Sequence, residues 1–228
     1  MHCESIELQA ADGHTLSAYV AHPDGTPLGG LLVLQEIFGV NAHIREVTEN
    51  FAAAGYLAVA PAMFDRVAPG IELDYSDFTR ARETMAQLNR EQCVADMGAA
   101  AAYASQAGKV GIVGYCWGGA MADLAACHGL VQAGVSYYGR MTVEWLDLQP
   151  QCPMIYHYGE HDALIPLQLV EDIAARRSGK VYVWGGADHG FCCTERPQYH
   201  QTSAEKSQAI TLDFLRAELA ADAAHPEA

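Results

Sequence analysis

The sequence predicts an α/β fold: a mostly parallel central sheet of about eight strands with helices on both faces. Three observations lead to this expectation. After an opening hairpin, short apolar segments alternate with helical ones, a pattern typical of parallel strands joined by crossover helices. Near the middle of the chain a buried strand passes through a G-x-C-x-G turn into a helix. No repeat, linker or low-complexity block interrupts the 228 residues, so we expect a single domain over residues 1–228.

The hydrophobic pattern places the strands. Alternating apolar and polar residues around Asp12-Gly13 predict an antiparallel hairpin of half-buried strands. The later strands are short, continuous apolar runs, which indicate burial on both faces of the sheet. These runs fall at residues 31–34, 56–61, 109–113, 131–137, 153–157 and 180–184.

Helix signals occupy the segments between the strands. Asn41 is placed to cap a helix that Gly55 ends. Residues 62–75 are expected to be irregular, and residues 76–106 to be helical with a break near Asn89-Arg90. Further helices are expected at 120–126, from Pro166 to about Arg177, and from Glu205 to about Ala220 with a frayed tail after it.

Composition restricts the function classes. The net charge of −15 argues against nucleic acid and anionic membranes as partners. The N-terminus lacks a signal peptide and no apolar run has the length of a membrane span, so we expect a cytoplasmic protein. Seven scattered cysteines in a chain of this size favour reduced thiols. We expect a monomer that acts on a small molecule without a cofactor or metal.

The G-x-C-x-G turn has the features of a nucleophile elbow with cysteine at its apex. Gly114 and Gly118 let strand and helix pass close to each other, while Cys116 accepts a strained backbone. The helix N-terminus below the thiol favours negative charge, which suits a thiolate. A glycine-rich turn around an inert cysteine would have the same pattern, so catalytic partners must come from other loops.

Two loops at the carboxyl ends of later strands supply these partners, because active groups collect at that edge of a parallel sheet. His189 follows the last strand and is the expected base and acid, and Asp162 would orient its imidazole. Glu160 is an alternative to Asp162. The order Cys, Asp, His is that of α/β-hydrolase triads. In this arrangement the backbone N–H groups of Ile37 and Trp117 would form the oxyanion hole.

Two other interpretations use the remaining cysteines. Cys116 with Cys192 and Cys193 could form a non-hydrolytic redox sensor, although thiol chemistry alone does not need His189 or Asp162. A zinc site could draw on four residues, but their spacing matches no paired-ligand motif. These residues are His157, His161, Cys192 and Cys193.

Three motifs make the chain similar to the dienelactone hydrolase (carboxymethylenebutenolidase) family: residues 35–41, 111–119 and 137–139. The resemblance implies a single α/β-hydrolase domain that opens an enol-lactone or small ester through Cys116, His189 and Asp162. It also implies that Glu36 helps to generate the thiolate. The residues expected to contact substrate are Arg82, Phe38, Tyr137 and Phe191.

The sequence departs from the family pattern where two arginines would grip the substrate carboxylate. Arg82 matches the first, with Arg80 as the alternative. Cys193 stands where the second is expected, and that arginine is also the natural counter-ion of Glu36. Arg196, on the same loop, is a candidate to replace it. The tyrosine expected shortly after Arg82 is absent.

Overall fold

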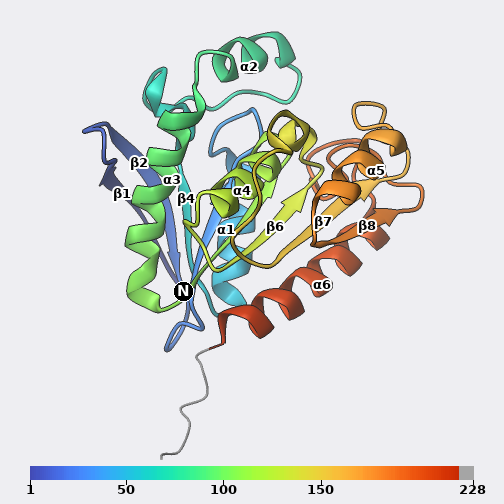
Figure 1. Ribbon diagram of the computed structural model, residues 1–228. Helices are drawn as coiled ribbons and strands as arrows, with labels where there is room; N and C mark the ends of the chain where they lie inside the picture. Colours follow the sequence, from blue (N-terminus) through green and yellow to red (C-terminus); the bar gives the residue numbers. More distant parts are fainter. Residues whose placement is uncertain (221–228) are drawn as a thin grey trace, which may run out of the picture.

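A computed structural model describes residues 1–220, in which eight strands form one sheet (Figure 1). The strand order is β1-β2-β4-β3-β5-β6-β7-β8. β2 pairs antiparallel with β1 and β4, and all other pairs are parallel, which confirms the predicted mostly parallel sheet. The strands are β1 (His2–Gln9), β2 (Thr15–His22), β3 (Gly30–Leu34), β4 (Leu57–Pro61), β5 (Val110–Tyr115), β6 (Ala133–Tyr137), β7 (Met154–Gly159) and β8 (Lys180–Trp184).

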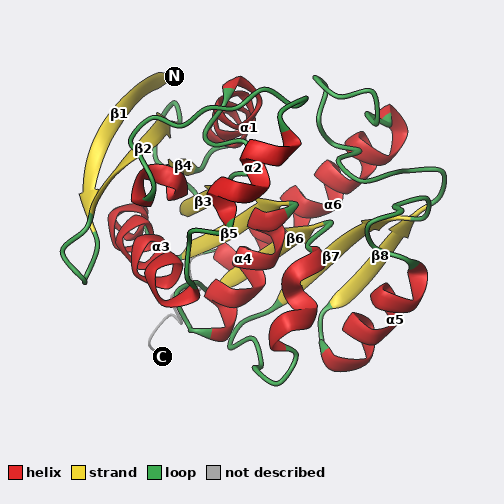
Figure 2. Cartoon of the chain, turned by 90° about the horizontal axis from the view of Figure 1, so that it is seen from above, coloured by secondary structure: helices red, strands yellow, loops and turns green. Residues whose placement is uncertain are grey.

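Helices cover both faces of the sheet. Figure 2 shows α1 and α6 on one side and α3, α4 and α5 on the other. α2 lies above the sheet in Figure 1. The α-helices are α1 (Ala42–Ala53), α2 (Phe78–Met85), α3 (Arg90–Ala104), α4 (Trp117–Cys127), α5 (Leu167–Arg176) and α6 (Gln201–Leu219), and the 3₁₀ helices are η1 (Met63–Arg66), η2 (Ser105–Ala107) and η3 (Arg140–Trp145).

The core lies along the central strands. Every residue of β3, β4, β5, β6 and β7 is buried, because helices pack on both faces of these strands. The edge strands β1 and β8 are only partly buried. The continuous apolar runs of the sequence therefore correspond to strands covered on both faces.

The structure has the helix cap predicted at Asn41 and the helix break predicted near Asn89-Arg90, but two helices start at other residues than predicted. Asn41 accepts a hydrogen bond from Ile44 N at 3.1 Å, and Asn89 starts α3 by accepting one from Gln92 N at 2.9 Å. However, α4 begins at Trp117 rather than residue 120, because the apex Cys116 is itself the N-cap. α6 begins at Gln201, upstream of the predicted Glu205, with no side-chain cap to mark its start. The expected frayed tail lies beyond the described residues.

A buried polar network fixes α4 behind the elbow. Asp123 is fully buried and accepts hydrogen bonds from Tyr156 Oη at 2.6 Å, Trp145 Nε1 at 2.9 Å and Arg177 Nε at 2.8 Å. These partners come from β7, η3 and the end of α5. Because the charge of Asp123 is paired and all its partners are held in place, the network joins α4 to three other elements.

Within residues 1–220, no helix has the length and apolar character needed to cross a membrane.

Candidate active site

Cys116 occupies a strained turn between β5 and α4. Its φ of 55° lies in the left-handed region, which non-glycine residues rarely adopt. The flanking glycines are required by close packing. A Cβ on Gly114 would overlap the carbonyl of Gly118, and a Cβ on Gly118 would overlap the backbone at the end of β3. A 3.0 Å hydrogen bond from Cys116 N to the carbonyl of Tyr137 joins the turn to the end of β6.

Cys116, His189 and Asp162 form one line of contacts, although they lie far apart in the sequence. His189 Nε2 is 3.1 Å from Cys116 Sγ, and His189 Nδ1 is 2.7 Å from Asp162 Oδ2. The second carboxylate oxygen of Asp162 accepts backbone hydrogen bonds from Leu164 at 2.8 Å and Ile165 at 3.1 Å. These backbone hydrogen bonds hold the Asp162 carboxylate in place, and the carboxylate holds the His189 imidazole in its orientation.

Glu160, the alternative partner of the histidine, points elsewhere. Its carboxylate accepts a hydrogen bond from Gly186 N at 2.9 Å and lies 3.6 Å from His161 Nε2. The geometry therefore favours Asp162 as the residue that orients His189.

The electrostatics around His189 favour its protonated form. Burial of the ring lowers its pKa, but the charge of Cys116 and the hydrogen bonds that the ring makes to Asp162 and Cys116 outweigh burial and raise the pKa to about 10. An imidazolium between a carboxylate and a sulfur can stabilise a thiolate and later protonate a leaving group.

Cys116 opens into a cavity of about 620 Å³. Trp117 lines it as the first residue of α4, so its N–H has no acceptor within the helix. Ile37, in the turn that follows β3, lines it too. Both residues predicted for the oxyanion hole therefore line the same cavity as Cys116. The other lining residues are Phe38, Phe78, Arg82, Met85, Ala86, Arg140, Met141, Ala163, Leu164, His189 and Arg196.

Glu36 is buried next to this cavity and pairs with Arg196. Its Oε1 is 3.3 Å from Arg196 Nη1, and their side chains are 1% and 7% exposed. Burial raises the pKa of Glu36, against the opposing effect of Arg196. The guanidinium also lies 5.6 Å from the ring centroid of Tyr75 and 5.9 Å from that of Phe78. Arg196 is thus the counter-ion of Glu36, while Cys193, at the position of the expected arginine, contacts the Tyr75 hydroxyl at 3.3 Å.

Two residues expected to contact substrate lie outside the cavity. Tyr137 is fully buried, with its hydroxyl 2.7 Å from Thr211 Oγ1 and its ring stacked on Tyr115. Phe191 is also fully buried and packs against Tyr138. Both side chains therefore pack in the core next to the site and do not line the cavity. Of the four expected contact residues, the cavity lining includes Arg82 and Phe38.

Sequence reasoning missed Arg140, which lines the cavity from the start of η3, shortly after β6. Its Nε donates to the Leu164 carbonyl at 3.1 Å, two residues beyond Asp162. Its position shortly after the carboxyl end of a strand is the sequence feature that could have identified it as a site residue. Phe78 and Leu164 are exposed apolar residues that also line the cavity, and no sequence feature marked them as site residues.

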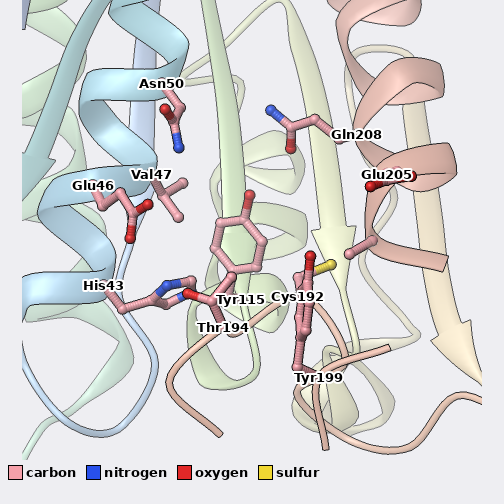
Figure 3. A pocket seen from close by; sticks show the side chains of 11 residues that line it. His43, Glu46, Val47, Asn50, Tyr115, Cys192, Thr194, Tyr199, Glu205 and Gln208 are labelled. Atoms are coloured by element: carbon pink, nitrogen blue, oxygen red, sulfur yellow. The ribbon is translucent and has the colours of Figure 1, made fainter. Parts of the chain in front are cut away.

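A second cavity of about 270 Å³ lies between α1 and α6 (Figure 3). Cys192 and His43 both line it, along with Glu46 and Glu205. Cys192 Sγ lies 3.8 Å from Ser207 Oγ, and burial raises the pKa of this thiol. Cys192 thus faces a different cavity from Cys116.

The residues considered for zinc do not assemble. His157 is fully buried, stacked against Tyr137, and its Nδ1 accepts a hydrogen bond from Trp184 Nε1 at 3.2 Å. His161 is exposed beside Glu160. In the part of the chain that the structure describes, no group of three or more His, Cys, Asp or Glu residues is arranged to hold a metal ion.

Comparison with known proteins adds independent information. A model of the dienelactone hydrolase family matches residues 16–219. The chain is 38% identical over 226 residues to the carboxymethylenebutenolidase of Pseudomonas putida, covering 93% of this chain and 95% of that protein. It is 33% identical over 230 residues to a putative carboxymethylenebutenolidase of Escherichia coli (strain K12), covering 90% and 84%. A putative dienelactone hydrolase from Klebsiella pneumoniae has a similar crystal structure, with a TM-score of 0.82 and 30% identity over 96% of this chain and 100% of that one.

Proposed function

The chain belongs to the dienelactone hydrolase family and is a carboxylic-ester hydrolase with the α/β-hydrolase fold, and from this premise we propose that it cleaves small esters or enol-lactones through Cys116, His189 and Asp162. One observation carries the proposal. The imidazole of His189 lies 3.1 Å from the Cys116 sulfur and 2.7 Å from the Asp162 carboxylate. These are the contacts that a nucleophile, its proton carrier and an orienting group require.

The first half of the reaction forms a thioester. The Cys116 thiolate attacks the carbonyl carbon, and the developing oxyanion accepts hydrogen bonds from the N–H groups of Ile37 and Trp117. When the C–O bond breaks, the leaving oxygen takes the proton from His189 Nε2. The acyl group then remains on sulfur, and the imidazole is neutral.

The second half hydrolyses the thioester. Neutral His189 removes a proton from water while the water oxygen attacks the thioester carbon. Collapse of this intermediate expels the Cys116 thiolate and releases a carboxylic acid. The thiolate and the imidazolium are thereby restored together, with Asp162 holding the ring throughout.

In this proposal Glu36 assists thiolate formation through its charge. Its carboxylate is held by Arg196 rather than by the sulfur. The pair is buried next to the cavity, so a substrate that displaces Arg196 would free a negative charge close to His189. The charges of Glu36 and His189 already act on each other, since His189 contributes to lowering the pKa of Glu36.

The test is hydrolysis of 4-nitrophenyl acetate and of a dienelactone by wild type and Cys116→Ala. We expect the variant to lose at least about a thousandfold in kcat/KM, because no other group can form the acyl intermediate. Cys152→Ala, on the loop before β7, is the control and should retain wild-type rates. Acid quench and mass spectrometry should find the acyl group on Cys116. Equal rates for wild type and Cys116→Ala would reject the proposal.

A further inference from the structure

Polar side chains from two helices line the cavity between α1 and α6. His43, Glu46 and Asn50 follow each other at intervals of three and four residues, so they share one face of α1. Glu205 and Gln208 line the cavity from α6. Helix faces turned toward a neighbouring element are ordinarily apolar. Two polar faces around one cavity therefore require a specific explanation.

His43 is the residue of this cavity that points to a ligand. It is 3% exposed, yet neither of its ring nitrogens has a hydrogen-bond partner in the part of the chain that the structure describes. Figure 3 shows its imidazole pointing from α1 toward Tyr115, which also lines the cavity. Burial lowers the pKa of His43 to about 4, so at neutral pH the ring is uncharged and one of its nitrogens is an acceptor. A buried acceptor of this kind is costly unless a ligand or a water molecule hydrogen-bonds to it.

The charge of the lining favours a cation. Glu46 and Glu205 line the cavity and no lysine or arginine does. Within residues 1–220 neither of these carboxylates forms an ion pair. Glu205 accepts one hydrogen bond, from Gln201 Nε2 at 2.8 Å, through a single carboxylate oxygen. Tyr115 and Tyr199 add aromatic rings to the lining, and the faces of such rings attract cations.

We propose that the cavity between α1 and α6 binds a small organic cation with primary ammonium groups, with His43 accepting an N–H and Glu46 and Glu205 pairing with the charge. Its volume of about 270 Å³ suits a ligand of the size of a short alkylamine or diamine. The site is separate from that of Cys116, whose cavity is lined by three arginines and no carboxylate and would repel the same cation. The inference does not depend on the proposed hydrolase function.

The experiment compares three ligands of matched length that differ in charge. These are 1,4-diaminobutane with two ammonium groups, butylamine with one, and the neutral 1,4-butanediol. Isothermal titration calorimetry on the full chain at about pH 7 measures their binding. The diamine should bind saturably at one site with a Kd of about 1 mM or tighter. Butylamine should bind more weakly, because it can pair with only one carboxylate, and the diol should not bind detectably.

Variants of the lining test the assignment of the residues. Glu46→Gln and Glu205→Gln should each raise the Kd of the diamine about three- to tenfold, since each removes a charge-assisted hydrogen bond. His43→Phe keeps an aromatic ring but removes the acceptor nitrogen, and should raise the Kd at least about threefold. Glu171→Gln, on the exposed face of α5, changes the net charge equally and should leave the Kd unchanged. Because Glu46 and Glu205 are exposed, their variants keep the test valid even if His43→Phe does not fold.

Cys192 reports where the ligand binds, because its side chain lines the same cavity. In Cys116→Ala protein, which lacks the more reactive thiol, saturating diamine should slow the alkylation of Cys192 by iodoacetamide at least about threefold. Cys152, on the loop before β7, does not line this cavity and should react at an unchanged rate. Peptide mass spectrometry over time gives both rates.

Three results would overturn the inference. The first is the absence of saturable binding of either amine, which would leave the cavity to water alone. The second is equal binding of the diol and the diamine, or an equal Kd in wild type, Glu46→Gln and Glu205→Gln, because the carboxylates would then not recognise the ligand. The third is binding that leaves the alkylation of Cys192 unchanged, which would place the amine elsewhere on this acidic protein.

Discussion

Each of the two described cavities is lined by a cysteine and a histidine, but only one of them is arranged for chemistry. In the larger cavity Cys116 and His189 are 3.1 Å apart, and Asp162 holds the ring. In the cavity between α1 and α6 (Figure 3), both ring nitrogens of His43 lack a hydrogen-bond partner within the described chain. Its cysteine, Cys192, comes from the loop that follows β8.

The local electrostatics of the two cavities are opposite. Cys116 and Asp162 overcome burial and raise the pKa of His189 to about 10, whereas burial, with a contribution from Arg196, lowers the pKa of His43 to about 4. Burial also raises the pKa of Cys192. The comparison teaches that the residue types alone do not define a site: the proposed catalytic cysteine and histidine contact each other beside a counter-charge, whereas Cys192 and His43 only line the same cavity.

The largest expected difference between the cavities is in catalysis. His189→Ala should lower kcat/KM for ester hydrolysis by at least about a thousandfold, because in the proposed mechanism thiolate formation and both proton transfers depend on this ring. His43→Ala should change it by less than about fivefold. Steady-state kinetics on folded protein, with circular dichroism as the folding check, measures both. A loss in His43→Ala as large as that in His189→Ala would show that the two cavities act as one site.

A second, smaller difference should appear in thiol reactivity. At about pH 7, iodoacetamide should alkylate Cys116 at least about a hundredfold faster than Cys192, because only Cys116 lies against a cationic ring. His189 remains protonated well below its pKa of about 10, so the reaction at Cys116 should stay fast as the pH is lowered toward 6. Peptide mass spectrometry over time gives both rates.

His189→Gln is the control, since it removes the cation and should slow alkylation of Cys116 at neutral pH. Labelling of Cys192 before Cys116 would contradict the assignment of the reactive thiol and would revive the redox interpretation that pairs Cys116 with Cys192 and Cys193.

The sequence predicted the parts of this molecule that local rules determine. Continuous apolar runs predicted the buried strands, Asn41 predicted a helix start, and a helix break was expected near Asn89-Arg90, because each pattern acts over a few residues. The elbow was predictable for the same reason, since Gly114 and Gly118 leave no room for a side chain.

The sequence could not predict contacts that depend on how distant loops converge. The pairing of Arg196 with Glu36 joins residues 160 positions apart, and the place of Arg140 in the cavity wall depends on the loop that carries Leu164. The same limit explains why Tyr137 and Phe191 were expected to contact substrate. Their motifs show that both residues lie near the site in the chain. The direction of their side chains, however, depends on the packing of β6 against α6 and of the Tyr137 ring against the Phe191 ring, which turns both into the core.

The last difference between the cavities concerns buried charge. Arg196→Met should lower the free energy of unfolding by about 2 kcal/mol at about pH 8, because it leaves the 1% exposed side chain of Glu36 without its cation. Glu205→Gln, which changes an exposed residue at the other cavity, should cost less than about 0.5 kcal/mol. Urea denaturation measures both.

The cost of Arg196→Met should also depend on pH. Burial already raises the pKa of Glu36, and loss of the guanidinium, which lowers it, would raise it further. A carboxyl whose pKa is raised in the folded state stabilises the fold below its unfolded pKa and loses that contribution as the pH rises through the folded value. The destabilisation should therefore be smaller at about pH 5 than at about pH 8. Adding Glu36→Gln to Arg196→Met should abolish this pH dependence, and an equal cost at both pH values would mean that Arg196 balances some other charge.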